Sequence, residues 1–472
     1  MQFKLLLALG LALRLLTAVF SEGYWHPDEY FQIFEPLHFL RGHSLELPWE
    51  WQAQIRPLLQ VNIYRVLLWP FESILNPFNQ ILFTRMAMGM ASAGAFLFWA
   101  VSARSSGFLN QKNFERVLFY WAFLGFLPFL AVRTSSETAG AILFFLSFGF
   151  WEKLKLNPKR FTSLSFGFLV ALCFYLRFQM GFAFLGLGLW ILIYRPKILK
   201  DHGLQMATGF SIGFFLGLLS DRIGYGNWVF SPWNYFKANI LEGAASHFGV
   251  EPLWGYVRMV VTQYFPWILF LFGSWLLFLK NKFKSEISFL TLAFFVAHSL
   301  VGHKEFRFIS FIFWFSPLFL AHLEGTLATT WPVLWRWTFR IGMSLSTVYL
   351  LVGFFPIRSE MGFYRQFVNR VPSGSRIEVA EGTEIPFRAH GLALNFLGYK
   401  GFQFIVSDGA GKPESHYSFS KIHLKTEHCK LLLVKNEVPN LPFDLDELII
   451  NGGKIKQGFL YECNNSQSYK AQ

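Results

Sequence analysis

The sequence predicts an α-helical, polytopic membrane protein with a small mixed α/β domain near its C-terminal end. The chain of 472 residues is 53% hydrophobic and only 15% charged, whereas soluble globular domains carry roughly 25% charged residues. Its apolar residues gather in about eleven long runs before residue 356, and a spanning helix needs about 20 mostly apolar residues. After about residue 356 the apolar runs shrink to strand length, and turn residues separate them.

The candidate spans account for most of the first 355 residues. They cover residues 3–20, 84–103, 117–132, 138–151, 162–178, 180–194, 204–220, 260–279, 286–302, 308–323 and 335–355. The first run resembles a signal peptide, but Ser21-Glu22-Gly23 is a poor cleavage site, so we expect an uncleaved span. Pro70 and Glu72 interrupt the run 61–75, for which we expect an interfacial or re-entrant position.

The distribution of Lys and Arg predicts the orientation of these spans. If the chain starts inside, each cytoplasmic loop is short and basic, which follows the positive-inside rule. The basic residues of these loops are Arg104, Lys112, Arg116, Lys153, Lys155, Lys159, Arg160, Arg195, Lys197, Lys200, Lys280, Lys282, Lys284, Arg336 and Arg340. The outer segments are then 21–60, 133–137, 221–259, 303–307 and the part after about 356. The net charge of +13 therefore indicates membrane topology, and no zinc-finger spacing or basic recognition helix indicates nucleic acid as a partner.

Two domains are predicted from this pattern. Residues 1–355 form the transmembrane domain, with a first outer loop at 21–60 and a large outer loop at 221–259, and residues 356–472 form a soluble domain outside the cytoplasm. The expected strands are RIEVAEG, LALNFLGY, FQFIVSD, KLLLVKN and GFLYEC. Cys173 lies in an apolar run and is expected to be a buried thiol. Cys429 and Cys463 lie in the polar tail, where they either pair in an oxidising compartment or stay free.

The first outer loop opens with His26-Pro27-Asp28-Glu29-Tyr30, directly after the first span. Two adjacent carboxylates at a membrane boundary are costly to desolvate unless they have partners. In one interpretation, Asp28 and Pro27 simply end a helix in a solvated loop. In the other, a carboxylate acts as a general base that takes a proton from an acceptor hydroxyl, and this role requires hydrogen-bond reach.

The same loop continues with Trp49-Glu50-Trp51 and then Arg56. Tryptophans that flank an acid fit a sugar-binding wall, where the rings stack on the C–H groups of a sugar. A single Trp at this depth is more often an interfacial anchor. Both interpretations stay open for Trp49 and Trp51.

Two further outer segments carry candidate binding residues. Arg133 and Glu137 flank three hydroxyl residues at a helix boundary, a pattern that fits either a simple cap or a polar ligand. Asn234 and Asn239 offer amide donors and acceptors in the long segment 221–259, which is rich in aromatics and glycine. Long outer loops of this composition usually do more than connect two spans.

The last motif is His303-Lys304-Glu305-Phe306-Arg307-Phe308, between two apolar runs. One interpretation is an interfacial anchor with a local Lys–Glu pair. The functional interpretation is a phosphate site, because Lys supplies a point charge and Arg a bidentate fork. A phosphate leaving group needs charge neutralisation more than it needs a strong general acid.

The motifs that the sequence lacks also narrow the function. It contains no GxxxxGK[ST] loop and no Rossmann glycine fingerprint. Asp444-Leu445-Asp446 resembles the metal-binding pair of nucleotide-sugar transferases, but no nucleotide-binding fold precedes it, so we expect a solvated turn. No HExxH motif or histidine cluster indicates a metal, and no cofactor is predicted. A lipid-phosphate sugar is therefore a better candidate donor than a nucleotide sugar.

Taken together, these segments resemble the family-22 glycosyltransferases of the GT-C fold, the lipid-phosphate-mannose-dependent mannosyltransferases of N-glycan and glycosylphosphatidylinositol (GPI) assembly. The similar segments are 26–32, 49–51, 133–137, 221–256 and 303–308, so the resemblance covers about residues 1–320. The residues of these segments are most similar to those of the third mannosyltransferases of GPI assembly, which add an α-1,2-linked mannose. A bacterial relative that acts on another glycolipid is an open alternative.

The resemblance implies a dolichyl- or polyprenyl-phosphate mannose donor, a mannosylated glycolipid or lipid-linked glycan as acceptor, inversion at the anomeric carbon and no metal. The base of the family maps onto Asp28, with Glu29 as its neighbour or substitute. The donor phosphate site maps onto Lys304 and Arg307, with His303 close by. The expected location is a multi-pass position in the membrane, with the active site facing the endoplasmic reticulum lumen or a bacterial periplasm.

The sequence departs from the family pattern at several points. The segment 133–137 is short, Arg56 is followed by Pro57 rather than Ser, and an Arg-Pro-Thr-like site reads Arg177-Phe178-Gln179. These departures affect the identity of the acceptor more than the chemistry.

Two other classes of function are alternatives. A lipid or glycan transporter should carry mid-span charges and a two-fold repeat of hydropathy, whereas here the acids and bases gather on one side. A non-catalytic scaffold of glycolipid assembly would not need both a carboxylate and a phosphate-binding pair.

Overall fold

The computed structural model describes residues 3–43, 47–262, 267–354, 360–380, 383–389, 392–407, 417–420, 429–437 and 456–463. The chain divides into two compact units. The helical unit comprises residues 1–20, 49–67 and 83–354, and the mixed unit comprises residues 21–48, 68–82 and 355–472. A boundary between units therefore follows Phe354, while the predicted extent of the two domains stays a prediction.

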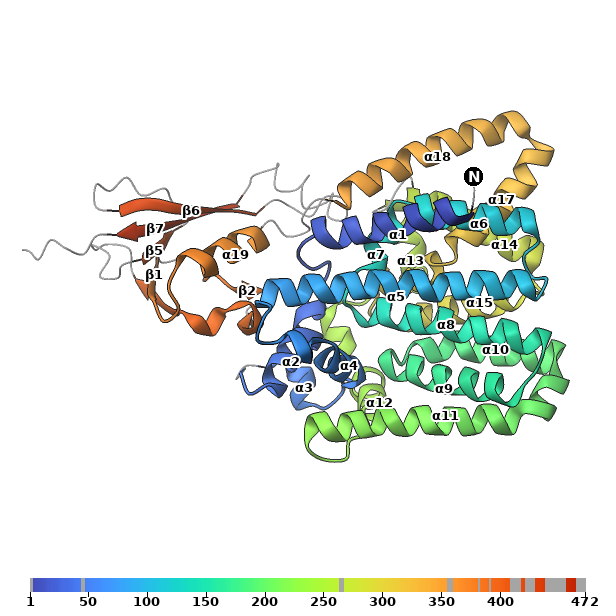
Figure 1. The fold of residues 1–472 in the computed structure, drawn as a ribbon, viewed down its shortest axis with the longest axis horizontal. Coiled ribbons are helices and arrows are strands. Elements are labelled where there is room, and N and C mark those ends of the chain that lie inside the picture. Colours follow the sequence, from blue (N-terminus) through green and yellow to red (C-terminus); the bar gives the residue numbers. More distant parts are fainter. Residues whose placement is uncertain are drawn as a thin grey trace, which may run out of the picture. The chain divides into compact units, whose positions relative to one another are not determined.

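Helices make up the helical unit, and Figure 1 shows many of them lying side by side. Those that lie wholly or mostly in it are α1 (Phe3–Phe20), α3 (Trp49–Gln52), α4 (Leu59–Leu68), α5 (Pro77–Ser105), α6 (Gln111–Phe123), α7 (Phe126–Ala131), α8 (Ser136–Leu156), α9 (Arg160–Leu176), α10 (Met180–Tyr194), α11 (Pro196–Tyr225), α12 (Ser231–Phe236), α13 (Gly255–Thr262), α14 (Trp267–Lys282), α15 (Glu286–Leu300), α16 (Ser310–Phe313), α17 (Ser316–Thr330) and α18 (Pro332–Val352). Three single turns (η3, Lys237–Leu241; η4, Ala244–Phe248; η5, Phe306–Ile309) complete it.

Each of the predicted spans coincides with helical residues, although the count of eleven is not confirmed. In the described part of the chain, α1, α5 and α11 are long and apolar enough to cross a membrane. The stretch 306–330 would make a fourth span, broken by a bend of 57° between its two halves. Helices α9, α10 and α15 are apolar but shorter. Residues 263–266, inside the predicted span 260–279, lie outside the described residues.

The predicted span 117–132 is interrupted, because α6 ends at Phe123 and α7 begins at Phe126. Backbone groups freed by such a break must find partners when no water is near. The Arg14 guanidinium donates to the Trp121 carbonyl at 3.3 Å, and the Ser346 hydroxyl donates to the Phe123 carbonyl at 2.7 Å. The Gly125 N–H donates in turn to the Ser346 oxygen at 2.8 Å. Side chains from α1 and α18 therefore stabilise the break.

Glycines bring α11 and α9 into close contact. Gly209 and Gly213 lie one turn apart on α11, and a Cβ added at either would clash with a backbone carbonyl oxygen of α9. At Gly213 the added atom would lie 2.6 Å from the Phe168 oxygen. Small residues four apart are a common way for apolar helices to pack backbone against backbone. Figure 1 shows α9 between α8 and α11.

We expect Gly213→Ala to lower the free energy of unfolding by about 1–3 kcal/mol, because the new methyl group overpacks the α9–α11 contact. The matched control is Gly188→Ala on α10, where an added Cβ meets nothing within 4 Å. Thermal unfolding in detergent measures both variants. Equal unfolding midpoints for the two variants would contradict the close packing.

The mixed unit contains a five-stranded sheet in the order β4-β1-β5-β7-β6. Strand β1 (Arg376–Ala380) pairs in parallel with β4 (Gln403–Ser407) and β5 (Tyr417–Ser420), and β7 (Lys456–Cys463) runs antiparallel to β5 and β6 (Cys429–Glu437). Helix α19 (Glu360–Arg370) contacts β6, and its aromatic side chains are buried. The unit also holds η1 (Tyr30–Phe34), α2 (Glu35–Leu40), η2 (Trp69–Phe71), β2 (Arg388–Ala389), β3 (Leu392–Ala393), η6 (Asn395–Leu397) and η7 (Tyr399–Gly401).

Four of the five predicted strands form. The exception is LALNFLGY, where only β3 (Leu392–Ala393) is extended; 3-10 turns lie on both sides of Gly398, whose positive φ of 119° does not fit a strand. Strand β5 was not predicted. Cys429 lies opposite Cys463 in the β6–β7 register, but their side chains lie outside the described residues, so pairing and free thiols both stay open. Cys173 is a buried free thiol, as predicted.

Candidate active site

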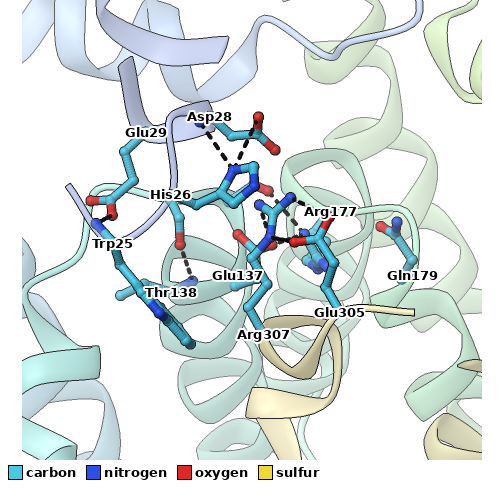
Figure 2. Close-up of polar contacts among 12 residues, drawn as sticks. Trp25, His26, Asp28, Glu29, Glu137, Thr138, Arg177, Gln179, Glu305 and Arg307 are labelled. Atoms are coloured by element: carbon cyan, nitrogen blue, oxygen red, sulfur yellow. Dashed lines mark hydrogen bonds and ion pairs between the residues drawn. The ribbon is translucent and has the colours of Figure 1, made fainter. Parts of the chain in front are cut away.

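The motif 303–308 follows α15, and its last three residues begin η5; the Arg307 side chain is held by two carboxylates. The Arg307 Nε donates to Glu305 Oε2 at 2.5 Å, and Nη2 donates to Glu305 Oε1 at 3.2 Å. A second carboxylate, Glu137, accepts from Arg307 Nη1 at 3.3 Å. Figure 2 shows the guanidinium between these two acids. Bidentate and doubly paired contacts of this kind hold a guanidinium in one orientation.

Glu137 links Arg307 to a second arginine, Arg177. Glu137 lies in the first turn of α8, after the N-cap Ser135, and its Oε1 accepts from Arg177 Nη1 at 2.9 Å. Arg177 directly follows α9 as its C-cap, and Nη1 also donates to the Ser136 hydroxyl at 3.1 Å. The Glu137 carboxylate therefore pairs with two arginines, Arg177 and Arg307 (Figure 2). These pairs are consistent with the interpretation of Glu137 as part of a polar site.

His303 is placed so that its protonated form is favoured. Its Nε2 lies 3.0 Å from Glu305 Oε1, and its Nδ1 lies 3.1 Å from the Gly249 carbonyl oxygen. Because both partners are acceptors, an imidazolium with two N–H groups satisfies both contacts. The hydrogen bond to Glu305 accordingly raises the pKa of His303 above its ordinary value of 6.5.

Lys304 is buried, with a relative exposure of 5%. Its ammonium donates to the carbonyl oxygens of Val301 and Glu251, at 2.5 Å and 3.2 Å. Burial lowers the pKa of Lys304 below its ordinary value of 10.5. The Glu251 side chain instead pairs with Arg258. Within the described residues Lys304 therefore adds charge to the motif without forming an ion pair with a carboxylate.

The cluster carries more positive than negative charge. It contains the cations Arg177, Lys304 and Arg307 and the carboxylates Glu137 and Glu305, which leaves one net positive charge. A protonated His303 brings the net charge to two. This balance suits an anion such as a phosphate, whose oxygens are recognised by charge-assisted hydrogen bonds.

A second group of predicted residues lies together in the helical unit. Arg56 Nη2 pairs with Glu50 Oε1 at 2.6 Å, and the guanidinium carbon lies 5.5 Å from the centre of the Tyr235 ring. The Trp51 and Tyr225 ring centres are 5.0 Å apart. Asn234 donates to the Gln54 carbonyl at 3.2 Å. These contacts join the first outer loop to the segment 221–259.

A hydrogen bond connects this aromatic group to the neighbourhood of Arg177. Gln179 follows Arg177 by two residues, and its amide donates to the Tyr235 hydroxyl at 2.6 Å. The turn Arg177-Phe178-Gln179 therefore lies between the charged cluster and the aromatic group.

Three predicted binding residues are placed differently. The Asn239 amide donates to the Tyr235 carbonyl of its own turn at 3.1 Å. The Arg133 side chain is fully buried, with its guanidinium carbon 4.6 Å from the centre of the Phe129 ring. Trp49 is 42% exposed. The described contacts therefore connect none of the three directly to Arg307.

The two acids of the first outer loop belong to the mixed unit and differ in their surroundings. Glu29 is 2% exposed, and its Oε1 accepts the Trp25 N–H at 2.7 Å, which fixes the turn. The Asp28 side chain is 23% exposed, and its Oδ1 lies 3.2 Å from His26 Nδ1 (Figure 2). Tyr30–Phe34 then forms a π-helix, a local irregularity that is frequent at functional sites. Asp28 is therefore more accessible to a substrate than Glu29.

Sequence reasoning did not select Arg177 or Glu305 as site residues. Arg177 had a usable signal, because it is a charged residue inside the apolar stretch 162–194, and intramembrane ionisable residues usually mark functional sites. Glu305 is part of the motif, but its role as the carboxylate that orients Arg307 and His303 needs the three-dimensional contacts.

Comparison with known proteins gives a family for most of the chain. A profile of the Alg9-like mannosyltransferase family matches residues 5–370. Mannosyltransferase APTG1 of Arabidopsis thaliana is 26% identical over 310 residues, which cover 63% of this chain and 54% of the relative. GPI alpha-1,2-mannosyltransferase 3 of Homo sapiens is 28% identical over 342 residues, 68% of this chain and 58% of the relative. The chain therefore spans between half and two thirds of these curated relatives.

Solved structures with a similar fold include ArnT from Cupriavidus metallidurans. Its complex with undecaprenyl phosphate matches with a TM-score of 0.54 over 99% of both chains, at 10% identity. Its apo form matches with a TM-score of 0.52 over 97% of both chains, at 9% identity. At this level of identity the likeness concerns the fold alone, and it supports the predicted GT-C architecture.

Proposed function

Because the chain belongs to the Alg9-like mannosyltransferase family, we propose that it transfers mannose from a dolichyl- or polyprenyl-phosphate carrier to a mannosylated glycolipid. The observation that carries this proposal is the positively charged cluster in which Glu137 and Glu305 hold Arg307. Such a cluster fits a reaction whose leaving group is a phosphate. The ArnT structure of the same fold holds undecaprenyl phosphate, which supports a lipid-phosphate donor.

In the proposed reaction, Asp28 takes the proton of the acceptor hydroxyl. The hydroxyl oxygen attacks the anomeric carbon of mannose from the side opposite the phosphate, so the configuration inverts. The C–O bond to the lipid phosphate breaks, and the electron pair stays on the phosphate oxygen. Arg307, Lys304 and a protonated His303 neutralise the negative charge that develops there, which is the main task of catalysis for such a leaving group.

Glu137 and Glu305 act as positioning residues in this proposal. Arg307 would otherwise sample many rotamers, and each immobilised long side chain costs conformational entropy when a ligand binds. Held by two carboxylates, the guanidinium is already ordered before the donor arrives. Arg177 shares Glu137, so both arginines are oriented by one acid.

The acceptor is proposed to be GPI-like, with an α-1,2-linked product, because several curated relatives are GPI mannosyltransferases. A lipid-linked glycan is the nearest other acceptor. The aromatic group formed by Trp51, Tyr225 and Tyr235, with the Glu50–Arg56 pair, offers ring faces and polar groups that suit a sugar. The active site is proposed to face the endoplasmic reticulum lumen or a bacterial periplasm, as the basic inner loops indicate.

We expect the affinity for a lipid-phosphate donor to fall as the pH rises through the pKa of His303. That pKa is raised above 6.5 by Glu305, so the imidazolium is fully present below 6.5 and is lost as the pH passes the raised value. The donor KM should therefore increase with pH in this range. Measuring KM between mildly acidic and mildly basic pH in the wild type and in His303→Gln tests this, and an equal pH dependence in both proteins would contradict it.

Transfer of labelled mannose in proteoliposomes tests the proposed function. The assay supplies a short-chain polyprenyl-phosphate mannose or a nucleotide-mannose, with a panel of mannosylated lipid acceptors. We expect label to reach a lipid acceptor from the lipid-phosphate donor alone. Transfer from the nucleotide sugar would contradict the proposed donor, and no transfer from either would favour a transporter or a scaffold.

A further inference from the structure

Arg177 and two other polar side chains each have a buried atom without a hydrogen-bond partner in the described part of the chain. These atoms are Arg177 Nη2, the Tyr256 hydroxyl and His298 Nε2. The relative exposure of the three residues is 6%, 1% and 5%. A buried polar atom without a partner is costly, and such atoms in a native protein generally meet a ligand or an ordered water.

The three side chains come from separate elements and lie close together. Arg177 is the C-cap of α9, Tyr256 lies in α13 and His298 lies in the last turn of α15. The Tyr256 ring lies 6.1 Å from the ring of Phe295, one turn before His298 on α15, and the His298 ring lies 6.1 Å from that of Phe182, five residues after Arg177. Arg177 itself pairs with Glu137, which also pairs with Arg307. The group therefore adjoins the charged cluster.

The hydrogen-bonding capacity of the group identifies the ligand chemistry. His298 Nδ1 lies 2.8 Å from the Phe294 carbonyl oxygen, which accepts only, so Nδ1 carries the proton. In the neutral ring Nε2 is then an acceptor and needs a donor. Arg177 Nη2 can only donate, and the Tyr256 hydroxyl can do either. A phosphate offers acceptors alone and leaves His298 unmatched, whereas hydroxyl groups both donate and accept.

The position of the group next to a proposed phosphate site also indicates which hydroxyl-bearing ligand it binds. A hydroxylated ring attached to a phosphate would place its hydroxyl groups within a few ångströms of the phosphate oxygens. The aromatic rings of Phe182 and Phe294 flank the His298 imidazole, with centroids 6.1 Å and 4.1 Å away. Polar atoms set among aromatic rings are typical of sites that recognise a small polar ligand.

We propose that Arg177, Tyr256 and His298 bind hydroxyl groups of the donor's sugar, beside the phosphate held at Arg307. This inference rests on the proposed function, because it assigns the part of the site that recognises the sugar rather than the carrier. Tyr256 and His298 are then specificity residues, since they distinguish a mannosyl phosphate from the bare lipid phosphate.

Binding measurements on the full-length protein in detergent test this assignment. The probes are citronellyl-phosphate mannose and citronellyl phosphate, titrated by calorimetry into wild type, Tyr256→Phe and His298→Phe. The controls are Tyr349→Phe on α18, which is only partly buried, and His322→Phe, whose Nε2 contacts Asn281. Thermal midpoints show whether each variant is folded.

We expect Tyr256→Phe and His298→Phe each to weaken binding of the mannosyl probe about tenfold, with little change for the bare phosphate. The control variants should bind both probes like the wild type. If the folded variants keep the wild-type preference for the mannosyl probe, only water occupies this group and the inference is wrong. If the wild type binds neither probe, the proposed function itself fails.

A series of monodeoxy-mannosyl probes gives a second test that needs no variant of uncertain folding. At least one deoxy probe should bind the wild type about tenfold more weakly than the mannosyl probe. Equal affinities for every deoxy probe would also overturn the inference, because no sugar hydroxyl would then be recognised.

Discussion

Arg307→Ala should lower the rate of mannose transfer by about 100- to 1000-fold at saturating donor, because it removes a preorganised donor from the departing phosphate. The change also leaves Glu305 and Glu137 without the cation that they share (Figure 2). Arg307→Lys should recover only part of the rate, since a lysine supplies charge but not a planar fork. The measurement is single-turnover transfer of labelled mannose in proteoliposomes.

The control for Arg307 is Arg340→Ala, because Arg340 lies on α18 beside the Trp337 ring and contacts no residue of the charged cluster in the described structure. We expect wild-type transfer from this variant. Full turnover by Arg307→Ala would contradict the phosphate assignment, whereas equal losses in both variants would indicate a general defect in folding.

Lys304→Ala should lower the transfer rate below that of the wild type, but by less than Arg307→Ala does, because the Lys304 ammonium is bound to carbonyl oxygens.

Asp28→Asn should lower transfer by about 100- to 10,000-fold, because an amide cannot take the proton of the acceptor hydroxyl. Donor binding should be unchanged, since Asp28 is assigned to the acceptor step. Measuring the transfer rate at a series of donor concentrations distinguishes a loss of rate at saturating donor from a loss of donor binding.

Glu29→Gln is the matched comparison for Asp28. The glutamine keeps an oxygen that can accept the Trp25 N–H, so the turn should persist. We expect this variant to retain most of the transfer rate. The reverse result, with Asp28→Asn active and Glu29→Gln inactive, would move the base to Glu29.

Much of the architecture follows from local patterns in the sequence. Apolar runs predicted helices that the structure contains, because a backbone in an apolar environment must satisfy its own hydrogen bonds. The break between α6 and α7 was not predictable from hydropathy, since Arg14 and Ser346, which stabilise it, lie more than 100 residues away on either side. Strand β5 was not predicted because it is only four residues long, which is shorter than each of the runs from which the other strands were predicted.

Some residues of the candidate site could also be predicted from local sequence patterns, and others could not. The motif 303–308 was recognisable because four ionisable residues at a membrane boundary are rarely without function. Tyr256 was not, because a single Tyr has no spacing to interpret. Arg177 carried a signal as a charged residue in an apolar stretch, but its role could not be predicted, since its partner Glu137 is distant in the chain. The bond between Arg177 and Glu137 spans 40 positions, so it depends on how α8 and α9 pack.

The most direct test of the proposed chemistry is the configuration of the product formed from a synthetic donor with the β configuration at its anomeric carbon. Wild-type protein in proteoliposomes would transfer labelled mannose from this donor to a mannosylated glycolipid, and the product would then be digested with an α-1,2-specific mannosidase. We expect the mannosidase to release the label, because inversion by the transferase converts the β donor into an α-linked product. A product that resists this digestion and yields only to a β-mannosidase would contradict inversion, and no labelled product would contradict the proposed donor or acceptor.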